Sequence, residues 1–599
     1  MRNYFDVIRR VGDHCVLSAA LSLPLLLGGC ADGNERTPLV EPDQPALTLT
    51  PTSVKTLSFT WSDNGAASEY RLLVNPDGAS GYSEAARFNG SRTHYDQTVF
   101  LPRRLDASYM LEACNNSGCA TSDAVYVNTD LSQAIGYLKA SNPDVNDYFG
   151  NGIALSANGD TLAVGAPGEE GDANAISYAG AVYIFHRDAS GSWSQQALLR
   201  ASNSGQFDQF GKNLTLNTSG DVLAVGAIRE SSDATGINND GTNDNADKSG
   251  AAYVFRRDTA GNWQQEAYLK ASNTTAGDYF GFSLALTGDG TTLAVGAPFE
   301  DSDATGSGGD QNNDAATQSG AVYTFAYDGN AWAQTAYLKA SNTGGGDQFG
   351  NSLAFSGDGD TLAIGAFAEA SGATGINGDQ NDNTAATAGA VYLFGPDGSG
   401  WVQNTYLKAS NTESADNFGR SVALDEDGDT LAVGANQEDS AANSIGGAQN
   451  DNTAVSSGAA YLFRNDGGWT QQAYIKASNA GAGDAFGFKL ALTGDGNTLA
   501  VSASNEQSAS TGLDGDASDN NADSSGAVYL FDWRGGAWQQ SHYLKANNTQ
   551  TDDFFGFSLA LAVDGGTLAV GAYHEDGSAT GVGGNEDNAT QNAGAVYLY

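Results

Sequence analysis

Large and small apolar residues alternate in a segment that returns seven times along the chain. In DYFGFSLALTGDGTTLAVGAP, residues 278–298, two short apolar runs flank one acidic turn. The second run, TLAVGA, alternates large residues such as Leu293 and Val295 with small residues such as Gly296. Such a strand fits a sheet that is covered on both faces, because large side chains must meet small ones to fill the gap. The repeats show no helical periodicity, so the pattern predicts buried β-strands.

The FG dipeptides of the seven copies set a regular period of 61, 70, 69, 69, 68 and 69 residues. A period of this length, made of strands, is typical of propeller blades. Each unit divides into four predicted strands, A to D, which resemble FSLAL, TLAVGA, GAVYLF and a final strand ending in YLKAS. The seven phenylalanines are Phe149, Phe210, Phe280, Phe349, Phe418, Phe486 and Phe555.

The two ends of the repeat region carry incomplete units. A lone D strand, AIGYLKAS at 134–141, precedes the first unit, and the last unit stops after its C strand, GAVYLY. If the first segment completes the last unit, a ring of seven closes and the exposed sheet edges disappear. We therefore expect an all-β fold, with a seven-bladed β-propeller over residues 131–599.

Before the repeats, residues 45–128 contain short strand-like runs such as TLSFTW, EYRLLV and SYMLEA, separated by turn formers. Their spacing predicts a small β-sandwich domain. Trp61, Tyr70 and SYMLEACN at 108–115 resemble a fibronectin type III module, in which an aromatic residue lies in the second strand and a tyrosine begins the sixth. The module would hold the larger domain away from a membrane.

Residues 1–29 have the features of a targeting signal. Basic residues precede an apolar run, CVLSAALSLPLLL, that is shorter than the roughly 20 residues a bilayer-spanning helix needs. The run ends in LGGC, which resembles the bacterial lipobox and implies lipid attachment at Cys30; an ordinary secretory signal is the alternative. Because Ala31 rather than Asp follows, the lipoprotein sorting rule implies an outer-membrane lipoprotein, on the surface or the periplasmic side. Residues 30–44 are polar and contain proline, as expected of a tether.

Two cysteines remain beyond the lipobox, Cys114 and Cys119 in EACNNSGCATS. An exported compartment permits disulfides, and a four-residue spacer across a turn can close one. Two free thiols are the alternative.

The formal net charge is −44, and no sizeable basic patch is visible. Nucleic acid is therefore not an expected partner, because phosphate binding needs clustered Lys and Arg. Strand parity places the A–B and C–D turns on one face and the long B–C loops and D–A connections on the other. The seven B–C loops carry 28 Asp and Glu against two basic residues, Arg229 and Lys248. Much of the negative charge is thus predicted to lie on one rim.

FG near the start of each unit, GAP after strand B, as at Ala297 and Pro298, and GAVY in strand C match the FG-GAP repeats of the integrin α-subunit head and its bacterial relatives. The resemblance implies a propeller that binds a protein or glycan ligand through its long-loop face, for adhesion. Integrin-type repeats often hold calcium in the A–B turn. Here that turn is short, as in SGDG at 356–359, and offers too few oxygens for an ion that takes six to eight.

Two interpretations of the acidic rim stay open: a calcium-dependent binding surface, or a solvated rim that keeps the protein soluble. Segments such as GDQNND and DGDASDNN offer the carboxylate, amide and carbonyl oxygens that Ca²⁺ prefers. The candidate calcium ligands are Asp310, Asp314, Asp379, Asp382, Asp514, Asp516 and Asp519.

Two further residue types recur in every unit. We expect the aspartate of the DxFG pattern to cap backbone amides where the chain turns into strand A. We expect the basic residue of strand D to be an outer-edge charge that discourages sheet-to-sheet aggregation. The aspartates are Asp147, Asp208, Asp278, Asp347, Asp416, Asp484 and Asp553. The basic residues are Lys139, Arg200, Lys270, Lys339, Lys408, Lys476 and Lys545.

No enzyme is expected. His186, His542 and His574 share no motif, and the chain has no activated-nucleophile signature, no HExxH and no phosphate loop. The expected function is a non-catalytic, lipid-anchored bacterial cell-surface binding or adhesion protein. It would be a monomer that touches the membrane only through its lipid. An envelope scaffold in a periplasmic or outer-membrane assembly is the alternative, and a polysaccharide-active enzyme is the third interpretation.

Overall fold

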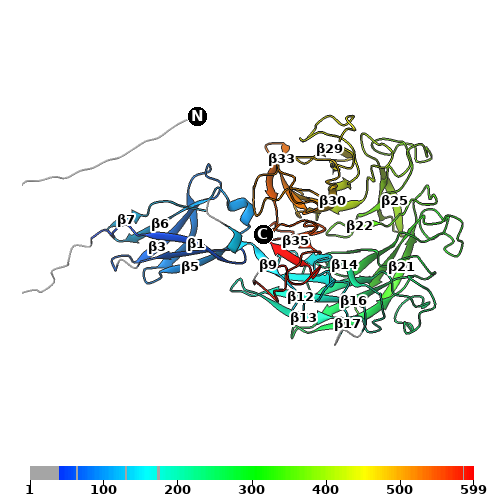
Figure 1. The fold of residues 1–599 in the computed structure, drawn as a ribbon, viewed down its shortest axis with the longest axis horizontal. Coiled ribbons are helices and arrows are strands. Elements are labelled where there is room, and N and C mark those ends of the chain that lie inside the picture. Colours follow the sequence, from blue (N-terminus) through cyan, green and yellow to red (C-terminus); the bar gives the residue numbers. More distant parts are fainter. Residues whose placement is uncertain (1–39, 63–64, 128–130, 172–175, 399, 585) are drawn as a thin grey trace, which may run out of the picture.

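The computed structural model describes residues 40–599 apart from 63–64, 128–130, 172–175, 399 and 585. The expected signal peptide, the expected lipid-attachment residue Cys30 and most of the expected tether therefore lie outside the described residues. The described chain forms a small β-sandwich joined to a large ring of sheets (Figure 1). Within this part, no helix has the length and apolar character needed to cross a bilayer.

The sandwich consists of two antiparallel sheets with a shared aromatic core. In it, Trp61 packs against Tyr70 at a ring-centroid distance of 5.6 Å, and Phe59 packs against Tyr109 at 4.7 Å. One sheet has the order β1 (Leu47–Ser53), β2 (Thr56–Trp61), β5 (His94–Thr98). The other has the order β4 (Ser83–Asn89), β3 (Glu69–Asn75), β6 (Ser108–Asn115), β7 (Gly118–Thr121), with β8 (Val125–Tyr126) paired to β6. A 3-10 helix, η1 (Leu101–Arg104), connects β5 to β6.

The tight β6–β7 hairpin carries the two cysteines. Cys114 faces Cys119 across the strand pair, and a disulfide with an S–S distance of 2.07 Å joins them.

Seven four-stranded antiparallel sheets form the ring, each with strands in the order A, B, C, D from the axis outward. This confirms the predicted all-β, seven-bladed propeller. The A strands are β10 (Gly152–Leu155), β14 (Phe210–Leu216), β18 (Ser283–Leu286), β22 (Ser352–Phe355), β26 (Ser421–Leu424), β30 (Phe486–Leu492) and β34 (Ser558–Leu561). The B strands are β11 (Thr161–Ala166), β15 (Val222–Ala227), β19 (Thr292–Ala297), β23 (Leu362–Ala366), β27 (Thr430–Ala435), β31 (Thr498–Ala503) and β35 (Leu568–Ala572). The C strands are β12 (Ala181–Arg187), β16 (Ala251–Arg257), β20 (Ala321–Tyr327), β24 (Ala390–Pro396), β28 (Ala459–Asn465), β32 (Ala527–Arg534) and β36 (Ala595–Leu598). The D strands are β13 (Trp193–Leu199), β17 (Trp263–Leu269), β21 (Trp332–Leu338), β25 (Trp401–Leu407), β29 (Trp469–Ile475), β33 (Ala537–Leu544) and β9 (Gly136–Leu138).

The ring closes as the sequence predicted. Strand β9, which follows a short 3-10 helix, η2 (Ser132–Ala134), pairs antiparallel with β36. Tyr137 lies opposite Tyr597, and Leu138 lies opposite Val596. The N-terminal end of the repeat region thus supplies the D strand of the last blade, and no blade keeps an unpaired C-strand edge.

The repeated FG and GA motifs let neighbouring blades approach closely near the axis. Each FG phenylalanine is buried and meets the tyrosine of GAVY edge-on, as Phe418 meets Tyr461 at 5.3 Å. The glycine of strand B faces the FG glycine of the next blade. A Cβ built on Gly434 would lie 2.0 Å from the carbonyl oxygen of Gly487, and Gly487 itself has φ +88°. Six blades keep glycine at this strand-B position, where a side chain would meet the neighbouring backbone, and the sixth blade carries Ser502 there.

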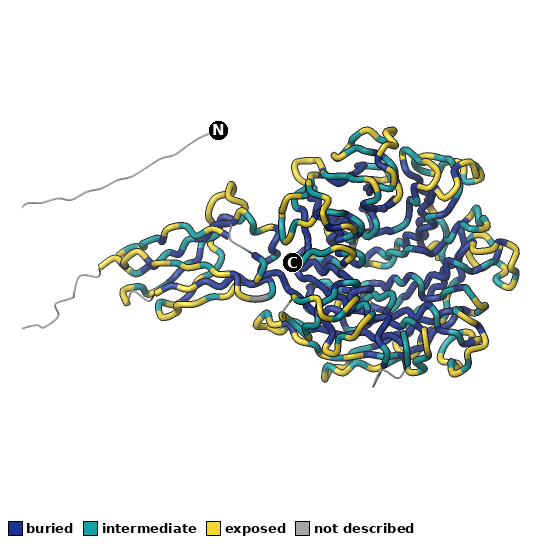
Figure 2. Tube along the Cα trace, viewed as in Figure 1, coloured by how far each residue is buried: buried dark blue, intermediate teal, exposed yellow. Residues whose placement is uncertain are grey.

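The two faces of the ring differ. Its turn face carries the short A–B and C–D turns. Its long-loop face carries the B–C loops and the D–A connections. Figure 2 shows that exposed residues concentrate in the peripheral loops, while the strands of the ring are buried or half-buried. The sandwich rests on the turn face, where Arg103 of η1 donates a hydrogen bond to Thr498 at 2.6 Å.

Candidate functional site

The long-loop face carries most of the polar sequence that the repeats do not need for their sheets. The structure shows that its acidic residues fall into two groups. Among the described B–C loop carboxylates, seven are buried, one in each blade, and the others lie nearer the solvent. The buried residues are Glu169, Glu230, Glu300, Glu369, Glu438, Glu506 and Glu575.

The basic residues of strand D pair with these buried glutamates, so the prediction of an outer-edge charge is wrong. The ammonium group of Lys270 lies 2.7 Å from Glu230, and both side chains are almost completely buried, at 0% and 3% exposure. The six lysine pairs measure 2.7–2.9 Å. In the first blade, Arg200 takes the place of lysine and contacts Glu169 at 2.6 Å. A lysine on the last strand lies inside because the B–C loop folds back over the D strand.

Each pair belongs to a small polar network that fixes the base of its loop. In the second blade, Glu230 accepts hydrogen bonds from Tyr268 at 2.8 Å and from Asn203 at 3.1 Å. The amide oxygen of Asn203 in turn accepts one from Tyr253 at 2.8 Å. Burial lowers the pKa of Lys270, and the nearby Glu230 carboxylate opposes that shift. A buried charge pair survives when its remaining hydrogen-bonding capacity is filled in this way.

Every DxFG aspartate accepts a hydrogen bond from the backbone amide three residues earlier, at 2.6–2.9 Å. The residue that follows the aspartate is in the left-handed region, as at Tyr279 with φ 56°, so the carboxylate holds a strained turn. Burial raises the pKa of Asp208 to about 7 and that of Asp278 to about 8, because desolvation outweighs the amide hydrogen bond.

The candidate calcium ligands lie on exposed or half-exposed loop tips. Asp310, Asp379 and Asp516 each accept a hydrogen bond from the amide two residues ahead, which forms a local turn. Within the described loops, no three acidic side chains converge on one point. The single three-residue group among the described residues contains Cys114 and Cys119, whose sulfurs are already joined to each other. The structure therefore does not bring Asp310, Asp314, Asp379, Asp382, Asp514, Asp516 and Asp519 together into a carboxylate cage.

Sequence analysis missed an aromatic patch on the long-loop face, made of half-exposed side chains from the first and last blades. The Tyr573 ring lies 4.1 Å from the rings of both Phe557 and His574, tilted against them by 41° and 51°. Tyr148 lies 5.8 Å from Tyr573, and it links the group to Tyr178 at 6.4 Å. These aromatics occupy positions where the repeat varies. The sequence already contained these aromatic residues beside each FG, but only ring closure brings residues 148 and 573 together.

One comparison with known proteins agrees with this architecture. A family model described as FG-GAP repeat matches seven segments, residues 135–185, 193–255, 263–325, 332–394, 401–463, 469–531 and 538–599. No curated protein matches the chain. Among solved structures, one described as "Crystal structure of the eukaryotic initiation factor" is similar at 11% identity. That match covers 73% of this chain and 89% of that one, and its TM-score of 0.30 is too low to establish a shared fold. The seven matched segments cover well over half of the sequence, and the chain therefore belongs to the FG-GAP repeat family.

Proposed function

We propose that this protein is a non-catalytic, lipid-anchored bacterial surface protein that binds a protein or glycan ligand through the long-loop face of its propeller, for adhesion. The observation that supports this most is the position of the sandwich. It covers part of the turn face and leaves the opposite face open for a ligand.

The contacts between sandwich and propeller are specific. Lys55, between β1 and β2, donates hydrogen bonds to the carbonyl of Gly566 and to the hydroxyl of Thr567 in the A–B turn of the last blade. Arg103 lies 3.6 Å from Asp532 at the end of β32. Burial lowers the pKa of Lys55 to about 7, and the nearby Arg187 adds to that shift. A buried, hydrogen-bonded lysine at the joint favours a fixed orientation over a flexible hinge.

The described chain begins at the end of the sandwich that is remote from the propeller. There Asn115, at the tip of the β6–β7 hairpin, donates a hydrogen bond to the carbonyl of Val40 (Figure 1). A lipid on Cys30 would therefore attach at the far end of a spacer that resembles a fibronectin type III module. The long-loop face would then point away from the membrane.

The long-loop face has the composition of a binding surface. Carboxylates surround it, and the aromatic patch around Tyr148 and Tyr573 lies half exposed among them. Interfaces commonly combine aromatic anchors with a wet polar rim. A calcium dependence would have to use loop carbonyl and amide oxygens together with isolated carboxylates. Such sites bind weakly, so millimolar Ca²⁺ should raise the melting temperature if this part of the proposal holds, and an unchanged melting curve would remove it.

The experiment is surface labelling and ligand capture with the full chain expressed on bacterial cells. We expect intact cells to be labelled and to bind a glycan or protein array. The double variant Tyr148→Ala/Tyr573→Ala should lose most of that binding, because it removes the aromatic anchors. Tyr126→Ala, an exposed tyrosine on the sandwich, serves as the matched control. Labelling only after cell lysis would favour the envelope scaffold instead.

A further inference from the structure

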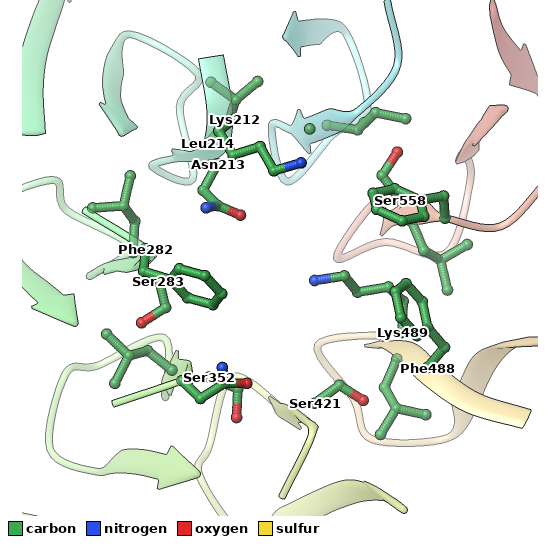
Figure 3. Close-up of a pocket in the computed structure, with 18 of the residues that line it drawn as sticks. Lys212, Asn213, Leu214, Phe282, Ser283, Ser352, Ser421, Phe488, Lys489 and Ser558 are labelled. Atoms are coloured by element: carbon green, nitrogen blue, oxygen red, sulfur yellow. The ribbon is translucent and has the colours of Figure 1, made fainter. Parts of the chain in front are cut away.

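A cavity of about 290 Å³ lies in the central channel, where the inner strands begin at the long-loop face. The first two residues after each FG line it, together with apolar side chains further along the strands. Figure 3 shows Lys212 and Lys489 directing their ammonium groups into the open centre from different blades, with the ring of Phe282 also turned inward. No acidic residue is among the described residues that line this cavity. The other end of the channel is lined by Asp425 and Glu426, so the channel is electrically polar.

Three cations occupy the cavity of a chain whose net charge is −44. They are Lys212, Arg420 and Lys489, and none of them is in an ion pair with a described carboxylate. The Arg420 guanidinium donates a hydrogen bond to the amide oxygen of Asn351 at 3.3 Å. It also lies 4.9 Å from the centroid of the Phe488 ring.

The fold does not require these cations, because other blades do without them. Directly after FG, two other blades carry asparagine, at Asn151 and Asn351, where Lys212 and Arg420 stand in theirs. At the next position, four blades carry serine. The Oγ of that serine donates to the FG glycine carbonyl of the neighbouring blade, as Ser421 does to Gly487 at 3.0 Å. Lys489 stands in the place of that serine.

A polar side chain also faces the same cavity. Asn213 lines it, and Figure 3 shows the Asn213 amide turned toward the open centre. An amide oxygen accepts hydrogen bonds. A ligand held between the cations could therefore use a hydroxyl group to donate to this amide.

The electrostatics point the same way. Burial lowers the pKa of Lys212 and of Lys489 to about 8, and the charge of Arg420 adds to both shifts. Three uncompensated positive charges around one cavity repel one another, and an anion placed between them would relieve that repulsion.

We propose that the channel mouth binds a sugar acid, either free or as the terminal unit of an acidic glycan. Arg420, Lys212 and Lys489 would pair with the carboxylate, since guanidinium groups match the fork of carboxylate oxygens. Asn213 would accept a hydrogen bond from a ligand hydroxyl. The Phe282, Phe488 and Phe557 side chains supply apolar faces for the carbon skeleton, and the cavity is at the small end of the range for ligand sites.

This inference deepens the proposed function and rests on it only in using the long-loop face. The test is isothermal titration of the purified full-length chain with D-glucuronate. D-Glucose is the control that keeps the hydroxyl groups but has no charge, and acetate is the control that keeps the carboxylate but has no hydroxyl groups. We expect binding of glucuronate, at least tenfold weaker binding of acetate, and no heat from glucose. A tetrameric oligouronide that binds more tightly than the monomer would identify the glycan end as the source, and equal affinity would identify the free acid.

The decisive variant is Lys212→Asn/Arg420→Asn/Lys489→Ser, which gives each blade the residue that other blades already carry. It should fold and should bind glucuronate at least thirtyfold more weakly. Lys248→Gln removes one positive charge from the rim of the same face and should change affinity less than twofold. The proposal falls if glucuronate does not bind, if the triple variant binds it unchanged, or if inorganic phosphate or an acidic peptide binds as tightly.

Because this titration needs neither cells nor anchor, its failure would leave the adhesion proposal standing. Loss of cell binding with intact glucuronate affinity would refute the adhesion proposal and leave the sugar-acid site standing.

Discussion

Basic side chains lie inside the fold in two regions of this acidic protein, and the two regions treat them differently. On the D strands, a lysine or arginine recurs in all seven blades, and each has a glutamate within 2.9 Å. In the channel, basic residues occur in only two of the seven repeated positions after FG, at Lys212 and Arg420, and once more at Lys489, without a carboxylate partner among the described residues.

A charged residue that recurs with its partner in every blade has a structural role in the repeat. A charge that departs from the repeat and lacks a partner costs stability, and so is better explained by a ligand. The comparison therefore separates structural from functional charges within one fold. Stability measurements on matched variants can test that separation.

The largest effect should follow deletion of residues 131–141, which removes β9 and with it Lys139. The last blade would lose its fourth strand, and Glu575 would be left buried without its cation. We expect the melting temperature to fall by on the order of 10 °C or more. Lys139→Met keeps the strand while removing the pair, and should give a smaller loss. A melting curve unchanged by the deletion would refute closure by this strand.

The second-largest loss of stability should follow from breaking a single Lys–Glu pair. Glu438→Gln leaves Lys476 buried without a counter-charge, so the free energy of unfolding should fall by about 3–5 kcal/mol. Chemical denaturation at neutral pH measures this. The double variant Glu438→Leu/Lys476→Met, which removes both charges, should recover most of the loss. If the single variant cost less than about 1 kcal/mol, the pairs could not be called structural.

The DxFG aspartates show a third treatment of buried charge, which is neutralisation. Their folded-state pKa is about 7, or about 8 at Asp278 and Asp553, against about 3.9 in an unfolded chain. Because the folded state binds these protons more tightly, the stability they contribute is present below pH 4 and is lost as pH rises from about 4 to 8.

Asp278→Asn should reduce that pH dependence by roughly 3–4 kcal/mol between pH 5 and 8, because about 1.4 kcal/mol is lost per pH unit while only the folded state keeps the proton. Unfolding curves at several pH values measure it. Asp303→Asn, an exposed loop aspartate, is the control and should leave the dependence unchanged. An identical pH profile for both variants would show that the Asp278 carboxyl is ionised throughout.

The smallest effect is expected in the channel. Lys489→Ser removes one member of a repulsive group and restores the residue of four other blades, so stability should stay within about 0.5 kcal/mol or rise slightly. Thermal unfolding without ligand measures this. A loss comparable to that of Glu438→Gln would mean that the channel cations are structural after all.

The sequence alone was sufficient for the fold, because each unit repeats the same alternation of large and small residues at a fixed period. The closure by β9 could also be predicted, since the two incomplete units complement each other. The ion-pair partner of Lys270 could not be predicted from the sequence. Glu230 lies forty residues earlier, in a loop whose path depends on the blade as a whole. The channel was equally hidden, because Lys212 and Lys489 become neighbours only when the ring is formed. The available signal was their departure from the repeat, which can be recognised only by comparing the blades position by position.

The pairing of β9 with β36 also constrains how the protein can be made. Leu138 contacts Val596 across more than four hundred intervening residues, so the circle stays open until the final blade has been synthesised. During synthesis, six stacked sheets would expose an apolar face at each end while β9 waits unpaired, and an unpaired strand invites pairing with other chains. Assembly of this protein should therefore be slow and vulnerable to interruption. A chain that stops just before its last strand would lack the closed ring, the channel and the cluster of cations inside the channel.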